Sequence, residues 1–258
     1  ATASKGTLSF ILNNMKQHEA VIKIMEWHGG YATLGHLNQE VLKVPDVEWK
    51  TKTPFASIRR IVQDERLFFK IKPGLWALRS YRDKLPRDIF PTSATPKHEQ
   101  EIFNHSYYQG LLVEIGNLKK YEAFVPNQDK NKKFLDRTLG EISSHIDFHH
   151  FGYDHMVRKA KTIDVSWFNI RKMPSVLFEV EHSTNIQNSL LKFIELQDYH
   201  ANFFIVADKA RKNEYLGKLS LNAFSPIKTR AQFMDYDKLS EWHTKTFEIT
   251  SIEQNLSF

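Results

Sequence analysis

The stretch TIDVSWFNIRKMPSVLFEVEHS, residues 162–183, decides how the second part of the chain folds. Its two apolar runs, 162–168 and 175–183, predict strands joined by a short turn. Carboxylates interrupt both runs, although strand interiors are poor places for Asp. Asp164 precedes Glu179 by fifteen positions, a separation that suits two adjacent antiparallel strands. The stretch therefore predicts a hairpin with acids on both strands.

The acids of this hairpin predict a metal site. Alternate side chains of a strand share a face, so Glu179 and Glu181 point the same way, and strand pairing would bring Asp164 to them. Like charges within a few ångströms repel strongly unless a cation or basic groups neutralise them. A divalent cation there would lower the pKa of a bound water and stabilise charge on a phosphate. The alternative is a solvated sheet face on which the acids have no catalytic role.

The chain contains no cysteine, which excludes disulfides and thiolate chemistry. A metal must then be held by Asp, Glu, His or carbonyl oxygens, which favours Mg²⁺, with Mn²⁺ as a substitute. The segment ISSHIDFHHFGYDH, residues 142–155, could instead suggest a histidine-rich metal site or an HNH-type nuclease. Because no paired Cys ligands accompany these histidines, we interpret the segment as a loop or helix end near the cleft.

The first part of the chain predicts three helices and two strands. A helix over 17–27 ends at paired glycines, Thr33 caps a second helix, and Thr53-Pro54 opens a third along PFASIRRIVQDE. RLFFKI and LWALR predict two strands joined by the turn at residues 72–74. Three helices and a two-stranded wing are typical of a winged helix, an α+β DNA-binding domain.

The net charge of +6 belongs to this first part. Residues 1–100 carry 16 Lys and Arg against 10 Asp and Glu, whereas residues 101–258 are balanced. Such asymmetry favours a polyanionic partner, although an ordinary solvated basic face stays open as an explanation. No apolar run is long enough to cross a bilayer and the first residues do not resemble a secretory signal, so we expect a cytoplasmic protein without a membrane partner.

Helices alternate with short apolar strands in the second part, which indicates an α/β sandwich around a central sheet. The predicted elements are a helix over 98–118, a strand over 121–126, a helix over 134–146, the two acid-bearing strands, a helix over 186–200, a strand over 201–208 and a short helix through 215. A charged, proline-containing stretch separates the parts, so the predicted domains are 1–84 and 98–258, with 85–97 as the linker.

The first part resembles the HARE winged-helix family, which recurs in chromatin proteins and fused to restriction-type nuclease domains. The resemblance rests on TPFASIRRIV and on the wing pattern F-K-x-x-P-G-L-W-A-L from Phe69 to Leu78. It implies DNA contacts from Lys50, Lys52, Thr53, Ser57, Arg59, Arg60, Gln63, Lys70 and Lys72. Two alternatives stay open: these residues solubilise an exposed helix face, or the domain mediates protein contacts.

The second part resembles the PD-(D/E)XK nuclease superfamily, which places an acid on one strand and E-x-K on the next. The resemblance implies an α/β, restriction-endonuclease-like mixed sheet flanked by helices. It makes Asp164 and Glu179 metal ligands and adds the carbonyl of Val180. Glu181 stands where Lys is usual, a departure that some restriction enzymes of this superfamily share.

The resemblance leaves the usual lysine unassigned and suggests further residues. The positive charge would come from Lys161, Lys172 or Lys192. Glu114, in the helix before the core, is a further candidate ligand, since several family members carry a metal-binding acid there. Gln197 and Tyr199 would orient water or phosphate, as comparable helix residues do in some members.

These observations predict a type II-like restriction endonuclease that hydrolyses double-stranded DNA with a divalent metal. Asp164 and Glu179 would be ligands, and Glu181 a ligand or base. We expect a bacterial protein that cuts as a homodimer, because two cuts in a duplex usually need two active sites; a cognate methyltransferase is conjecture. The alternatives are a DNA-binding regulator with an inactive nuclease-like domain, which Glu181 favours, and a repair or RNA-processing nuclease.

Overall fold

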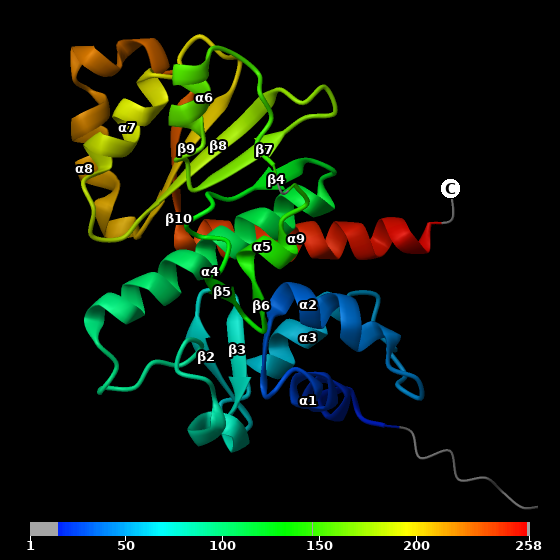
Figure 1. Ribbon diagram of the computed structural model, residues 1–258. Coiled ribbons are helices and arrows are strands. Elements are labelled where there is room, and N and C mark those ends of the chain that lie inside the picture. The colour runs from blue at the N-terminus through cyan, green and yellow to red at the C-terminus, as the bar shows by residue number, and fades with distance from the viewer. Residues whose placement is uncertain (1–14, 146, 257–258) are drawn as a thin grey trace, which may run out of the picture.

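The structure, a computed structural model, describes residues 15–145 and 147–256. It is a mixed α/β protein whose five-stranded sheet is flanked by helices, which confirms the predicted fold class at that level (Figure 1). A smaller N-terminal part, blue to cyan in Figure 1, lies on one side of the sheet-containing part. Among the described residues, no helix is both long and apolar enough to cross a membrane.

In the described residues, the N-terminal part consists of three α-helices, two 3₁₀ helices and an antiparallel sheet of order β1-β3-β2. Its elements are α1 (Gln17–Trp27), β1 (Tyr31–Thr33), α2 (Leu34–Glu40), η1 (Val41–Lys43), α3 (Pro54–Val62), β2 (Phe68–Lys72), β3 (Leu75–Leu78) and η2 (Arg79–Lys84). Thr33 caps α2 as predicted, since its hydroxyl oxygen accepts a hydrogen bond from the His36 N–H at 3.2 Å. Gly74 in the β2–β3 turn has a φ of 76°, a left-handed conformation that favours glycine.

Two features of this part differ from the sequence expectation. α3 ends at Val62, and a turn over residues 64–67 replaces the predicted last helical residues. The sequence does not predict β1, because three residues are too few for a periodic signal. β1 is a strand only because it pairs with β3, which is remote in the sequence.

The second part is built on a sheet of order β10-β9-β8-β7-β4. The strands are β4 (Glu122–Phe124), β7 (Val165–Phe168), β8 (Pro174–Glu181), β9 (Asn202–Ala207) and β10 (Ala231–Asp235). β4, β7 and β8 pair antiparallel, whereas β8, β9 and β10 pair parallel. The remaining elements are α4 (Lys97–Leu118), β5 (Lys133–Phe134), β6 (Arg137–Thr138), α5 (Leu139–Ile142), α6 (Asp154–Ala160), α7 (Ile186–Ile194), η3 (Lys209–Arg211), α8 (Lys212–Leu219), η4 (Asn222–Ile227) and α9 (Tyr236–Asn255).

Helices cover both faces of this sheet and thereby fix the surroundings of the acids. α4 and α9 pack on the face that carries Phe178 and Val180. α7 and α8 pack on the opposite face, which carries Leu177. Because side chains alternate along β8, Glu179 and Glu181 lie on the α7 side.

The predicted helix over residues 134–146 is wrong. The described part of this segment forms the β5–β6 hairpin and the short helix α5, and residue 146 lies outside the described residues. Leu135 has a φ of 56°, a left-handed conformation that a helix of L-residues does not accommodate. α5 starts only after Thr138, which forms a capping box with Glu141.

The two parts of the chain share an apolar core. Leu75 of β3 is buried in the same cluster as Leu111 of α4, and so is Ile89 of the predicted linker. α9, red in Figure 1, also contacts α2. In that contact, Asn38 Nδ2 donates a buried hydrogen bond of 3.1 Å to Glu248 Oε1. The junction between the parts is therefore packed rather than loose.

Candidate active site

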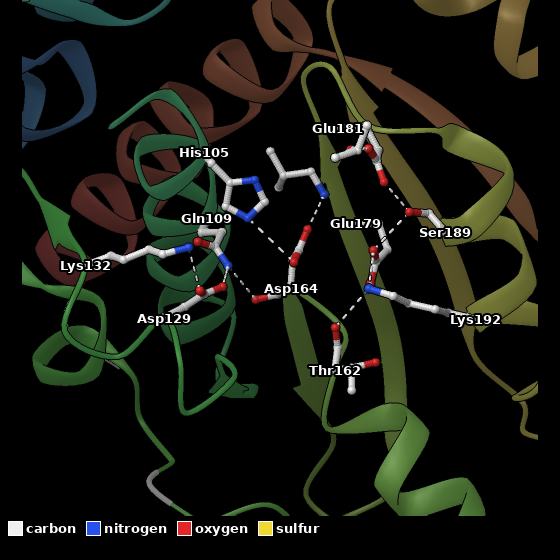
Figure 2. A network of polar contacts seen from close by, with 12 residues as sticks. His105, Gln109, Asp129, Lys132, Thr162, Asp164, Glu179, Glu181, Ser189 and Lys192 are labelled. Atoms are coloured by element: carbon white, nitrogen blue, oxygen red, sulfur yellow. Dashed lines mark hydrogen bonds and ion pairs between the residues drawn. The ribbon is translucent and has the colours of Figure 1, made fainter. Parts of the chain in front are cut away.

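Asp164 is the residue immediately before β7, so it lies at the start of the antiparallel β7–β8 pair. Its Oδ2 accepts a hydrogen bond from the Val180 N–H at 2.7 Å. Its backbone oxygen accepts a second one from Gln109 Nε2 at 3.1 Å, and Nε2 of His105 lies 3.5 Å from Oδ1. Figure 2 shows how these contacts hold Asp164 between α4 and β8.

Glu179 and Glu181 are 2% and 4% exposed, and both carboxylates meet side chains of α7. The two oxygens of Glu179 accept hydrogen bonds from Lys192 Nζ at 2.9 and 2.8 Å. Ser189 Oγ donates to Glu179 Oε2 at 3.0 Å and contacts a Glu181 oxygen as well. Lys192 Nζ also donates to the Thr162 carbonyl at 3.0 Å (Figure 2). Helix α7 therefore brings a lysine to the acids of β8.

These groups line a cavity of about 380 Å³ between α4, β8 and α7. The remaining lining is mostly polar, and it includes His98, Glu101, Lys132, His182, Ser183, Thr184, Asn185 and Asn188. Val180 lines the cavity too, and its N–H is the group that binds Asp164. The structure thus brings together all the predicted strand acids, Asp164, Glu179 and Glu181, at one cavity.

Burial and mutual repulsion set the protonation of these acids. Burial raises the pKa of Glu179 well above its ordinary value and the Asp164 charge raises it further, although Lys192 opposes both. Burial also raises the pKa of Glu181. Burial acts in the same direction on Asp164, but the charge and hydrogen bond of His105 outweigh it and leave that pKa below its ordinary value. A cation at the cavity would relieve this repulsion.

A set of side chains that could hold a metal ion includes Asp164 and two residues on its α4 side. Oxygen or nitrogen atoms of His105, Asp129 and Asp164 all lie within 4.8 Å of one another. Asp129 also accepts a hydrogen bond of 2.8 Å from Gln109 Nε2 and lies 2.6 Å from Lys132 Nζ. His105 and Asp129 are not among the residues predicted from the sequence. The spacing of His105 and Gln109 puts both on one face of a helix, a signal that was available, whereas Asp129 sits in an ordinary polar loop.

The structure does not bring Glu114 to this cavity. Its two carboxylate oxygens contact His36 Nε2 at 3.0 Å and His243 Nε2 at 2.8 Å, where α2, α4 and α9 meet. Burial raises the pKa of Glu114, but the charge and hydrogen bonds of the imidazoles outweigh it, so the pKa lies well below its ordinary value. The geometry therefore assigns Glu114 to the junction between the two parts.

The other predicted helix residues also lie elsewhere. Gln197 is in the turn after α7, where its backbone carbonyl accepts a hydrogen bond from Arg230. Tyr199 packs on Phe151 and contacts Met156. Among the lysines considered, Lys172 contacts Glu122, Lys161 is exposed after α6, and Lys192 alone belongs to the cavity lining.

The predicted DNA-contacting residues fall into two groups that share Lys70, which is exposed and also lies near the second part. Three of them face the second part: Arg59 pairs with Glu248 at 3.0 Å, Lys70 lies 4.0 Å from Asp237, and Lys72 donates to Asn104 at 2.9 Å. Burial lowers the pKa of Lys72 to about 8. The exposed members are Lys50, Lys52, Thr53, Arg60, Gln63 and Lys70, and Ser57 is half-buried. Part of the predicted DNA face therefore contacts α9 or α4.

Comparison with known proteins places the chain in a family. Residues 85–256 match the family model described as the C-terminal domain of the type II restriction enzyme NmeDI. The type II restriction enzyme NmeDI of Neisseria meningitidis serogroup C is 23% identical over 150 residues, which cover 54% of this chain and 42% of that enzyme. The chain thus spans less than half the length of this relative, and no solved structure matches it. Because the family match covers more than half of the chain and every residue of the cavity, the chain belongs to the family of the NmeDI C-terminal domain.

Proposed function

We propose that this chain is a type II-like restriction endonuclease that hydrolyses phosphodiester bonds of double-stranded DNA with a divalent cation. The observation that carries the proposal is the convergence of Asp164, Glu179 and Lys192 on one cavity in a chain of a restriction-enzyme family. An acid before one strand, a second acid on its antiparallel neighbour and a nearby ammonium group resemble the PD-(D/E)XK pattern, except that α7 and not the second strand supplies the ammonium group. The carboxylates suit a cation and the lysine suits a phosphate.

The donor set fits Mg²⁺, with Mn²⁺ as a substitute, because buried carboxylate oxygens are the ligands that hard cations prefer. Asp164 and Glu179 would hold the cation, beside the Val180 peptide. When bound, the cation stabilises the negative charge that develops on the phosphate. Lys192 would release at least one oxygen of Glu179 and turn its ammonium group toward the phosphate, where it donates a hydrogen bond.

Lys192 would replace the lysine that the second strand lacks. Glu181 occupies that strand position, and its carboxylate contacts Ser189. Lys192 reaches the same acids from α7, and its side chain is 28% exposed. Its charge and its access to the cavity support the role. Gln197 lies outside the cavity lining, so its predicted catalytic role does not belong to this proposal.

We infer that residues 1–84 act as a winged-helix DNA-binding domain and residues 98–258 as the nuclease domain. Three helices beside a small antiparallel sheet, together with the basic charge of the first 100 residues, support this inference. Lys52 and Arg60 are exposed and would contact phosphates, whereas Arg59 is engaged with Glu248. We also propose that the protein cuts DNA as a homodimer and that it has a cognate methyltransferase.

The test is cleavage of methylated and unmethylated plasmid DNA in Mg²⁺ or Mn²⁺ by the parent, Asp164→Ala and Glu179→Ala. We expect discrete fragments from the parent and none from either variant, with DNA binding kept in all three. Glu195→Ala, which removes an exposed acid just after α7, should cut like the parent. A folded parent that binds DNA but cuts none of these substrates with either metal would refute the proposal.

One observation favours a second function, a DNA-binding regulator with an inactive nuclease-like domain. Glu181 stands where a catalytic lysine is usual, and its carboxylate cannot supply the positive charge of that lysine. This alternative predicts DNA binding with no cleavage under any metal. A repair or RNA-processing nuclease would instead prefer single strands or RNA to the duplex, so the same assay with those substrates separates it.

A further inference from the structure

A second group of metal-ligating side chains lies at the edge strand of the sheet. Glu122 is the first residue of β4, and His145 and His149 follow α5 in the chain. His149 Nε2 is 2.5 Å and His145 Nδ1 is 3.6 Å from Glu122 Oε2. One ligand atom from each of the three lies within 4.8 Å of the others, and the two imidazole rings stack with centroids 3.8 Å apart.

This group is separate from the cavity described above. Glu122 pairs with Phe168 at the end of β7, whereas Asp164 lies before the start of that strand. At about 3.3 Å per residue, the four steps between Asp164 and Phe168 put the two groups about 13 Å apart along the sheet. None of the residues of this second group lines the cavity.

We propose that Glu122, His145 and His149 form a zinc site, with a water molecule as the fourth ligand. Two imidazoles and one carboxylate are a donor set that tetrahedral Zn²⁺ uses in proteins, and imidazole ligands disfavour Mg²⁺. Zinc–ligand bonds of about 2.0–2.1 Å require ligand atoms about 3.4 Å apart. The contact of His145 with Glu122 is close to that separation, and the contact of His149 reaches it by a shift of about 1 Å.

The polar environment of His145 points to a missing partner. Its Nδ1, the ring nitrogen that faces Glu122, is 3.6 Å from that carboxylate, too far for a good hydrogen bond. Phe168 lies against both imidazoles and contributes an apolar wall. Burial lowers the pKa of both histidines.

Lys172 is the group that competes with a metal here. Its ammonium group contacts Oε1 of Glu122, whereas the nearest atom of Glu122 to both imidazoles is Oε2. The carboxylate can therefore bind a metal through Oε2 while Lys172 keeps the other oxygen. Loss of Lys172 distinguishes a simple ion-pair network from a zinc site. In an ion-pair network, the loss removes one partner of Glu122 and weakens the network. In a zinc site, the loss removes a positive charge from beside the metal and so does not weaken zinc binding.

The experiment measures zinc binding to the full chain after treatment with a chelator, by competition with a chromophoric zinc indicator. Asp164→Ala/Glu179→Ala serves as the background, so that the proposed active site does not contribute. We expect one tightly bound zinc per chain, and a loss of affinity of at least about tenfold in Glu122→Gln and in His149→Gln. Lys172→Met should bind zinc at least as tightly as the background protein.

His150→Gln is the matched control, because His150 belongs to the same segment but is exposed and pairs with Asp154. Zinc should raise the Tm of the background protein and of His150→Gln, and leave the Tm of Glu122→Gln unchanged. Circular dichroism of each variant without metal verifies folding, and His145→Gln replaces any variant that does not fold. Absence of zinc binding, or equal binding by the ligand variants and the control, overturns the proposal.

Discussion

Lys192→Met is the variant that tests the proposed mechanism most directly. Lys192 Nζ makes hydrogen bonds of 2.9 and 2.8 Å to Glu179 and belongs to the cavity lining, so its loss removes the cation nearest to the acids. Removing one positioned donor from a developing phosphate charge costs about 2.7–4 kcal/mol, which corresponds to a rate lower by about 10²–10³. We therefore expect single-turnover cleavage in Mg²⁺ to fall by that factor while DNA binding persists.

The effect of Lys192→Met on stability should be much smaller than the effect on rate. Removal of one partner of a buried ion pair usually costs about 3–5 kcal/mol because the other charge is stranded. Here the raised pKa of Glu179 allows that carboxyl to take up a proton, so we expect a loss of only about 1–3 kcal/mol in urea unfolding.

Two further variants complete the Lys192 test. Lys161→Met removes an exposed lysine and should leave cleavage unchanged, whereas Lys192→Arg should restore only part of it, because a guanidinium is larger and planar. Cleavage by Lys192→Met within about threefold of the parental rate would refute the catalytic role of Lys192, since an ammonium group that binds the phosphate should contribute more than that to the rate. An equal loss in Lys161→Met would refute it as well.

Three other changes test the junction, the cavity and the core. Glu114→Gln should destabilise the protein by about 2–4 kcal/mol at pH 7. Folding lowers the pKa of Glu114, so the ionised carboxylate stabilises the folded protein at pH values above its ordinary pKa of 4.5. This stabilisation is lost as the pH falls through the lower pKa of the folded state. The difference in unfolding free energy between the parent and Glu114→Gln should therefore shrink toward pH 3 in urea unfolding. His105→Gln should raise the pKa of Asp164 and move the acidic limb of the pH–cleavage profile to higher pH; an unmoved limb would contradict the assigned contact. Gly110→Ala would place a methyl carbon 2.0 Å from the β5 phenylalanine ring and should cost about 1–3 kcal/mol or more in the same unfolding assay, whereas Gly217→Ala, which meets nothing within 4 Å, should be neutral or stabilising.

Local pattern predicts much of the fold. The helices α1, α2 and α3, the β2–β3 hairpin and the acid-bearing strands all follow from apolar periodicity and from capping or turn residues close by in the sequence. β1 escapes this reasoning because its partner β3 is more than forty residues away. β10 and α9 are likewise absent from the prediction. The 134–146 segment has the apolar content of a helix, whereas the structure pairs β5 with β6 and turns the chain at the left-handed Leu135.

The candidate site shows the same division. Glu179 and Glu181 lie on β8 and Asp164 immediately precedes β7, its antiparallel partner, so strand pairing and alternation predict their convergence. Helix residues are harder to assign, because a helix offers several acids and its rotation is set by packing. The sequence selects Glu114 on α4, whereas packing turns His105 and Gln109 toward Asp164 and leaves Glu114 with two histidines.

The buried Asn38–Glu248 contact and the common core have a mechanical consequence for the proposed enzyme. If the N-terminal part reads DNA, it cannot swing independently of the catalytic strands, because side chains of both parts fill the same interior. The packing of the two parts then fixes the distance between the bases that are recognised and the bond that is cut. Cleavage would occur at a constant offset from the recognition site, and a change in that offset would require repacking of α2 against α9 rather than a longer linker.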